Sequence, residues 1–249
     1  MTAELERIAT SMLTPQRGEP AVSTVSWESR DALQTRFGPL AYWASGSGPA
    51  VLLVHGWEGT HAHLDAFVAP LLARGARVVA VDLPAHGESA GTMSSLADCG
   101  EALANLGAHL GPLAGVIAHS AGSPSTALAL RAGMRAERVA LIATPERYDR
   151  YVKWIAEQEG VEADQLLATL KARGINVSSF VLPETAALLD IPALIVHSVD
   201  DRTCDIRGAQ RVASAWRGSE FFAVDGLGHM RILKDPAVID RVVQFMMAP

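Results

Sequence analysis

The chain has 249 residues, of which 49% are hydrophobic, so it can fold as one large domain with a sizeable core. Its net charge of −6 argues against nucleic acid or an anionic membrane surface as a partner, because both require a basic face. It has no apolar run of membrane-spanning length, no signal-peptide pattern and only two cysteines, so we expect a soluble cytoplasmic protein. Composition leaves the oligomeric state open.

Apolar runs bounded by turn residues alternate with segments of helical length along the chain. Two early segments with alternating polarity, 23–28 and 35–44, predict an antiparallel hairpin at one edge of a sheet. Continuous apolar runs predict buried parallel strands at 50–54, 77–81, 113–118, 139–143, 193–196 and 221–224. Helices are predicted at 63–74, 96–110, 123–132, 207–216 and 236–247. The sequence therefore predicts an α/β protein with a doubly wound, mostly parallel eight-stranded sheet.

The interval 144–189 breaks this alternation, because it is polar and helical and contains no convincing strand. It falls between two predicted core strands, which indicates a small helical cap inserted over the carboxyl ends of the strands. We therefore predict a core made of residues 1–143 and 190–249, with the cap at 144–189.

Tyr148, Tyr151 and Trp154 recur at helical spacing in the first part of this cap. Such a stripe more often packs against another helix than against a ligand. Ligand pockets are mostly apolar, however, so these three residues are also the candidates for binding the substrate.

The strand at 113–118 runs directly into His119-Ser120-Ala121-Gly122, and a helix with Pro124 in its first turn follows at once. This pattern is typical of a nucleophile elbow, which usually has the form G-x-S-x-G; here Ala118 takes the first glycine position. Small residues suit the turn, because the strand and helix backbones come close together there. The pattern predicts Ser120 as an exposed nucleophile.

A serine hydroxyl needs a base to accept its proton, and the base needs a carboxylate to hold its tautomer. Chains with this elbow carry the three groups in the order serine, acid, histidine, each at a strand end. His229 follows the last predicted strand and is the predicted base. Asp201 lies a short loop beyond strand 193–196 and is the predicted acid, with the adjacent Asp200 as the alternative.

The oxyanion formed by attack on a carbonyl needs preorganised donors, which are usually backbone N–H groups. The residue after the nucleophile, Ala121, is expected to supply one donor. The loop after the strand at 50–54 is expected to supply the other, and the N–H of Trp57 is the candidate. Gly56 and Gly59 allow this loop to fold back toward the serine.

Together these motifs resemble the α/β-hydrolase-fold serine hydrolases of the capped esterase and lipase-like kind, over about residues 22–249. The resemblance rests on His55-Gly56-Trp57, Asp82-Leu83-Pro84-Ala85-His86-Gly87-Glu88-Ser89, Ala118-His119-Ser120-Ala121-Gly122, and Asp201 with Gly228-His229. It implies a catalytic triad of Ser120, Asp201 and His229, an oxyanion hole at Trp57 and Ala121, and no cofactor or metal ion. Ala85, Ala118 and Ser198 stand where the family usually has glycine.

The activity that we predict is hydrolysis of a small-molecule carboxylic ester through an acyl-enzyme. A thioesterase, an amidase, a C–C bond hydrolase or a perhydrolase uses the same triad, and a ligand sensor on the same scaffold could keep it intact. The segment His61-Ala62-His63-Leu64-Asp65 resembles the start of a metallohydrolase site. The next expected histidine is absent, so we expect no metal to bind there.

Overall fold

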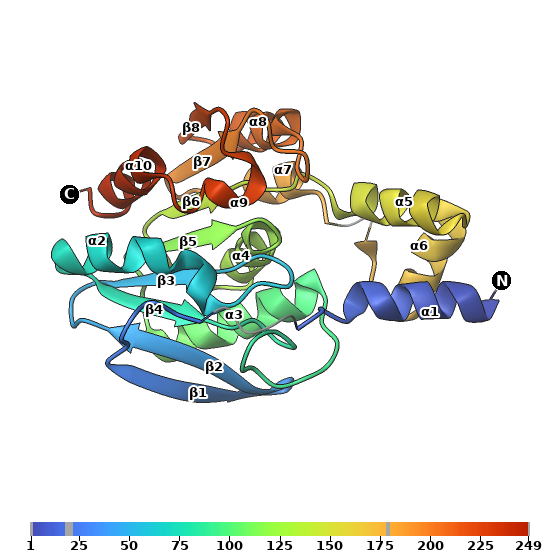
Figure 1. Ribbon diagram of the computed structural model, residues 1–249, viewed down its shortest axis with the longest axis horizontal. Helices are drawn as coiled ribbons and strands as arrows, with labels where there is room; N and C mark the ends of the chain where they lie inside the picture. Colours follow the sequence, from blue (N-terminus) through green and yellow to red (C-terminus); the bar gives the residue numbers. More distant parts are fainter. Residues whose placement is uncertain (1, 18–21, 178–179, 249) are drawn as a thin grey trace.

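The computed structural model of the chain describes residues 2–17, 22–177 and 180–248 (Figure 1). Within these residues an eight-stranded sheet has the order β1-β2-β4-β3-β5-β6-β7-β8. The strands are β1 Ser29–Thr35, β2 Gly38–Ser45, β3 Ala50–Val54, β4 Arg77–Val81, β5 Gly115–His119, β6 Val139–Ile142, β7 Ala193–Ser198 and β8 Ser219–Val224. Strands β3 to β8 pair in parallel, while β1 pairs antiparallel with β2 and β2 with β4. The predicted fold class is confirmed.

Helices cover both faces of the sheet, and each face has its own apolar cluster. The first cluster joins α3 Leu96–Leu110, α4 Gly122–Arg131, α7 Leu182–Ala186 and α8 Ile206–Ala215 to one face. The second joins the 3-10 helix η1 His61–Phe67, α2 Val68–Ala73 and α10 Pro236–Met246 to the other. Strands β3 and β5 are almost wholly buried between these layers, as their continuous apolar sequences predicted.

The six parallel strands and the five core helices agree with the prediction to within two residues at each end. The early hairpin is wrong in its first strand. The chain at 23–28 is a loop, whose residues Val25 and Trp27 pack against the core without pairing in the sheet. The true partner of β2 is β1, a largely exposed edge strand. An edge strand with a solvent-exposed face contains few apolar residues, so the apolar pattern of the sequence did not predict β1.

Three helices form a separate body beside the sheet, as Figure 1 shows at its right. They are α1 Thr2–Leu13, α5 Tyr148–Glu159 and α6 Ala163–Ala172, and they share one apolar cluster that includes Ile8, Val152 and Leu166. Ion pairs Arg7–Glu159 (2.6 Å) and Arg173–Glu6 (2.7 Å) cross the same contact. The N-terminal helix therefore packs on α5 and α6, which lie in the predicted cap.

The helix α1 was not predicted, although Leu5, Ile8, Ala9 and Met12 have the spacing of an amphipathic helix. The backbone N–H of Ser94 donates to the carbonyl of Leu13 (2.8 Å), which ties the end of α1 to the core. The division into a core and a cap at 144–189 remains a prediction. Across the described residues, no helix is both long enough and apolar enough to span a bilayer.

Candidate active site

Ser120 lies in the tight turn between β5 and α4, at the carboxyl edge of the sheet. Its backbone has φ = 49°, in the left-handed region that strains a residue with a Cβ. Its N–H donates to the carbonyl of Ile142 at the end of β6 (2.9 Å), which holds the turn. A Cβ at Gly122 would lie 2.4 Å from the carbonyl oxygen of His55, so the close approach of α4 and β3 requires glycine there.

His229 lies between Ser120 and Asp201 in the structure. Its Nε2 is 3.0 Å from the Ser120 Oγ, and its Nδ1 is 2.8 Å from Oδ2 of Asp201. Because a carboxylate only accepts, Nδ1 carries the proton and Nε2 is left to accept from the serine hydroxyl. His229 belongs to α9 Gly228–Arg231, which follows β8. The structure thus brings the three predicted residues into one hydrogen-bonded chain.

The Asp201 carboxylate is fully buried, and the turn that follows it holds it in place. Its Oδ1 accepts the backbone N–H groups of Thr203 (2.8 Å) and Cys204 (2.9 Å). Burial raises the pKa of this carboxyl, but the hydrogen bonds from His229 and Cys204 outweigh burial and hold its pKa below the usual value. Asp201 is therefore a fixed negative charge facing the imidazole.

Asp200, the alternative acid, points to a different group. Its Oδ1 accepts the backbone N–H of Gly228 (2.9 Å) and the hydroxyl of Ser198, and the Ser198 bond holds the pKa of Asp200 below its usual value. Ser198 Oγ also accepts the N–H groups of Leu227 (3.2 Å) and Gly228 (3.1 Å). We call Ser198 and Asp200 the loop clamp, because together they hold the backbone that carries His229.

The loop clamp was missed by the sequence reasoning, although one signal for it was present. The signal is Ser198 itself, because the alpha/beta hydrolases that the sequence resembles usually have glycine at this position. A serine hydroxyl at the end of a buried strand needs a hydrogen-bond partner, and none was predicted for it. Its partners come from a loop about 30 residues further along the chain. Only the folded sheet brings β7 and the loop after β8 side by side.

The loop after β3 approaches the serine closely. A Cβ on Gly56 would lie 2.9 Å from the Ser120 Cβ, so only glycine fits without a shift. Among the described residues no acceptor satisfies the backbone N–H of Trp57 or of Ala121, the two predicted donors. The Trp57 ring packs edge-to-face on His86 (4.9 Å between centroids). The half-buried Trp57 side chain is therefore held against His86, and the loop can offer its backbone to a ligand.

Backbone strain concentrates at this edge of the sheet. In the described part of the chain, the non-glycine residues with positive φ are Glu58, Ala85, Ser120 and Ala143. Each follows a strand end or lies in a loop at the carboxyl edge, and each costs on the order of 1 kcal/mol or more. Strained backbone that the surrounding fold holds in place is common at functional sites, which favours this edge as the candidate site.

Two buried histidines support the site from below. His119 Nε2 lies 3.0 Å from the His229 carbonyl oxygen and so donates to it. His55 Nδ1 bonds the carbonyl of Gly56 (2.7 Å), and its Nε2 accepts from the N–H of Leu83 (2.9 Å). Burial lowers the pKa of both imidazoles to about 3, so both are neutral near pH 7. They hold the loops of Trp57 and His229 without adding charge.

The predicted cap residues lie near the elbow. Tyr148 lines a small cavity together with Ala121, Leu96 and Phe180. Tyr151 is close enough to Glu58 for that carboxylate to raise its pKa, in addition to the larger effect of burial. The rings of Tyr148, Tyr151 and Trp154 form a series with centroid separations of 5.6 and 6.0 Å. The series therefore starts at the elbow and continues outward along α5.

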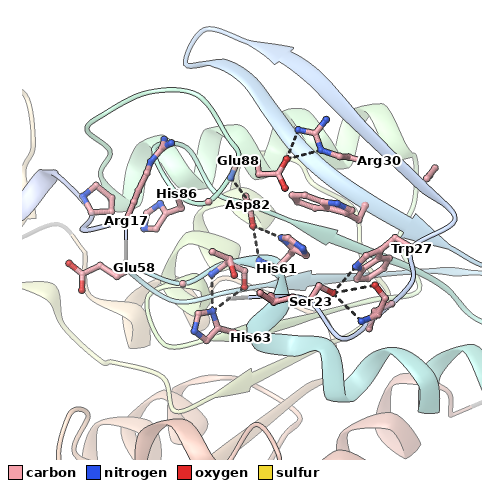
Figure 2. Close-up of a pocket in the computed structure, with 18 of the residues that line it drawn as sticks. Arg17, Ser23, Trp27, Arg30, Glu58, His61, His63, Asp82, His86 and Glu88 are labelled. Atoms are coloured by element: carbon pink, nitrogen blue, oxygen red, sulfur yellow. Dashed lines mark hydrogen bonds and ion pairs between the residues drawn. The ribbon is translucent and has the colours of Figure 1, made fainter. Parts of the chain in front are cut away.

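A much larger hollow, of about 950 Å³, lies elsewhere, between the N-terminal segment and the loop that follows Trp57. Figure 2 shows that polar side chains line it, and that several of them bind one another, such as Arg30 with Glu88. The Asp82 carboxylate accepts from the backbone and ring of His61 (2.7 and 3.0 Å) and from the N–H of Glu88 (2.7 Å). Ser120 and His229 do not line this hollow, so its size does not mark the candidate active site.

The metallohydrolase-like segment has other roles. His61 binds Asp82, the His63 ring accepts from the backbone N–H of Thr60 (2.9 Å), and Asp65 accepts from the backbone and hydroxyl of Thr24. The three side chains hold three different parts of the chain. Across the described ranges, no group of three or more histidine, cysteine, aspartate and glutamate residues could hold a metal ion.

Comparison with known proteins agrees with this fold. Residues 51–242 match the model of the alpha/beta hydrolase family, and the chain belongs to that family. The chain is 30% identical over 174 residues to the magnesium-chelatase 30 kDa subunit of Rhodobacter capsulatus. That match covers 66% of this chain but only 57% of the subunit, so little more than half of that relative is spanned.

Solved structures with the same fold have low sequence identity to the chain. An esterase from Exiguobacterium antarcticum superposes with a TM-score of 0.73 at 14% identity, covering 88% of this chain and 100% of the esterase. A hydrolase from Pseudomonas aeruginosa gives 0.70 at 21% identity, covering 89% of this chain and 99% of the hydrolase. At these identities the likeness establishes the fold, and any activity has to be argued from the site.

Proposed function

We propose that this hydrolase cleaves carboxylic esters by transferring the acyl group to Ser120 and then to water. The observation that supports this proposal most is the chain of hydrogen bonds from Ser120 Oγ through His229 to Asp201, at 3.0 and 2.8 Å. The first distance lets His229 take the proton of Ser120, and the second lets Asp201 hold the imidazole in place. No other serine hydroxyl in the described residues has a histidine partner.

In the proposed reaction, His229 Nε2 takes the proton of Ser120 as Oγ attacks the ester carbonyl carbon. The buried Asp201 carboxylate stabilises the imidazolium that forms. The N–H groups of Trp57 and Ala121 hold the oxyanion of the tetrahedral intermediate. When the intermediate collapses, the bond to the alcohol breaks and His229 gives its proton to the leaving oxygen. Water then attacks the acyl-enzyme by the same steps and releases the acid.

The direct test uses Ser120→Ala, with Ser214→Ala as the matched control. Ser214 is an exposed serine of α8 whose hydroxyl bonds only its own helix, to the carbonyl of Gln210 (2.9 Å). We expect Ser120→Ala to lower kcat on p-nitrophenyl acetate by at least about 10⁴-fold and Ser214→Ala to leave it unchanged. Undiminished turnover by folded Ser120→Ala protein would refute the mechanism.

Covalent labelling separates an enzyme from a ligand sensor on the same scaffold. A fluorophosphonate reacts with an activated serine, and mass spectrometry then locates the adduct. We expect the adduct on Ser120 and its loss in His229→Ala. An unlabelled Ser120 would favour the sensor. A substrate panel of thioesters, amides and β-diketones, with Ser120→Ala as the blank, tests the other reactions that use the same three groups.

A further inference from the structure

A small cavity, partly open to the surface, lies against Ala121, the residue whose N–H would hold the carbonyl oxygen. Its walls are Leu96, Pro124, Pro145, Glu146, Arg147, Tyr148 and Phe180, and its volume is about 20 Å³. On this scale one water molecule needs on the order of 10–15 Å³. The cavity itself therefore holds about one or two groups the size of a methyl.

The walls of this cavity on the side of α3 and α4 are buried, whereas the wall on the side of α5 is half-exposed. Leu96 is buried in the first turn of α3, which begins at the cap of Ser95 on the Asp98 N–H. Pro124 lies in the first turn of α4 and is buried as well. Tyr148 is half-buried, and it packs against the apolar cluster of α1, α5 and α6. An acyl chain that extends toward α3 and α4 would meet the packed side chains of Leu96 and Pro124.

The outer part of the aromatic series has the opposite character. Tyr151 and Trp154 are 39% and 53% exposed, and they are among the few large apolar side chains at the surface. The cap cluster already uses Val152 and Ala156 on another face of α5, so the cap does not need these rings for packing. Tyr151 also lies near Glu58, beside the oxyanion loop. The two rings form an open apolar surface at the mouth of the site.

We propose that the substrate is asymmetric: an ester of a short acid, of about two or three carbons, with a large, flat, apolar alcohol. The methyl or ethyl of the acid occupies the Ala121 cavity, and the alcohol stacks on Tyr151 and Trp154 as it leaves. Flat apolar groups stack favourably on aromatic rings at the separations already present in the series. The proposal rests on the function given above and adds the class of substrate.

The first experiment compares acyl lengths on one alcohol. The 2-naphthyl esters of acetate, propionate, butyrate and hexanoate are assayed with the unaltered protein. We expect kcat/KM to fall by at least about 100-fold from acetate to hexanoate, because each added methylene meets a packed wall. Leu96→Ala opens the same cavity from α3, and we expect it to reduce this preference at least about tenfold. Tyr148→Ala should do the same from the cap.

The second experiment tests the alcohol. Trp154→Ala should raise KM for 2-naphthyl acetate by about 3- to 10-fold at nearly constant kcat, and leave ethyl acetate unaffected. Glu157→Ala changes an exposed residue of the same helix and serves as the control. A KM increase for both esters would indicate a general disturbance of the cap and would overturn the stacking role.

The outcomes also separate this proposal from the function beneath it. If hydrolysis depends on Ser120 but the hexanoate ester is cleaved as fast as the acetate ester, the proposed esterase activity holds and the proposed preference for a short acid is refuted. If no ester is cleaved in a Ser120-dependent way and Ser120 takes no fluorophosphonate, the function itself fails. If Leu96→Ala and Tyr148→Ala leave the acyl preference unchanged, the cavity at Ala121 is not the acyl site.

Discussion

The carboxyl edge of the sheet is held together differently from the body that α1, α5 and α6 form, which we call the cap body. At the edge, Asp201 and the loop clamp are fixed by hydrogen bonds to backbone groups, and four strained residues are held by the buried strands beneath them. The cap body is held by side-chain packing among α1, α5 and α6. Directional bonds fix atoms to within fractions of an ångström, whereas a small packed cluster is easier to loosen. Chemistry should therefore depend on the edge and substrate preference on the cap.

The largest effect is expected from a substitution of Asp201 at the carboxyl edge of the sheet. Asp201→Asn preserves shape but lets the imidazole adopt the wrong tautomer, so we expect kcat on p-nitrophenyl acetate to fall about 10⁴-fold. Asp200→Asn keeps an oxygen that can accept from Gly228, and its loss should stay within about tenfold. Steady-state kinetics of both variants decide between the two aspartates. A larger loss in Asp200→Asn would reverse the assignment of the acid.

The cap is tested by removing part of its core. Leu166 is fully buried between α1, α5 and α6, and Leu166→Ala should cost about 2–5 kcal/mol of local packing. We expect faster hydrogen exchange in these three helices and a raised KM, with kcat nearly retained. Leu53→Ala, in the buried β3 strand, is the matched change in the sheet.

Leu53→Ala should instead lower the midpoint of global unfolding, and hydrogen exchange in α1, α5 and α6 should rise no more than in the rest of the molecule. Equal exchange throughout the molecule in Leu166→Ala would mean that the cap and the core unfold as one unit and are not stabilised separately.

A smaller effect is expected from the loop clamp. Ser198→Gly restores the residue that the family usually has, but it removes the acceptor for Leu227 and Gly228. We expect kcat/KM to fall about tenfold through misplacement of His229, while the KM for the ester changes little. Ser214→Ala is again the control. A variant that loses stability but keeps its full kcat would show that the clamp serves folding and does not position His229.

The smallest effect concerns pH. Unfolded histidine takes up a proton near pH 6.5, whereas buried His119 has a pKa of about 3 and stays neutral. The unfolded state thus binds more protons between pH 7 and 6, so the stability falls as the pH falls, by about 0.7 kcal/mol for this group. His119→Gln keeps a donor for the His229 carbonyl but cannot titrate. Urea unfolding at both pH values should show a decrease smaller by that amount, and an unchanged decrease would contradict the buried neutral state.

Sequence alone determined the features that depend on local pattern. Continuous apolar runs predicted β3 and β5, and the turn at Ser120 predicted the elbow, because strand burial and tight turns leave their mark on adjacent residues. The order of Ser120, Asp201 and His229 along the chain followed from the family resemblance, and the structure brings these residues together. Their catalytic roles await the kinetic tests.

Tertiary structure alone decided the remaining features, because they depend on residues far apart in the chain. The edge strand β1 has little apolar sequence, and α1 joins the cap only through contacts with α5 and α6. The loop clamp likewise unites β7 with a loop about 30 residues later. The cavity at Ala121 is a volume left between four segments, and a volume has no sequence pattern. Sequence patterns report on residues that are close along the chain, whereas these features depend on residues that are close only in the folded structure.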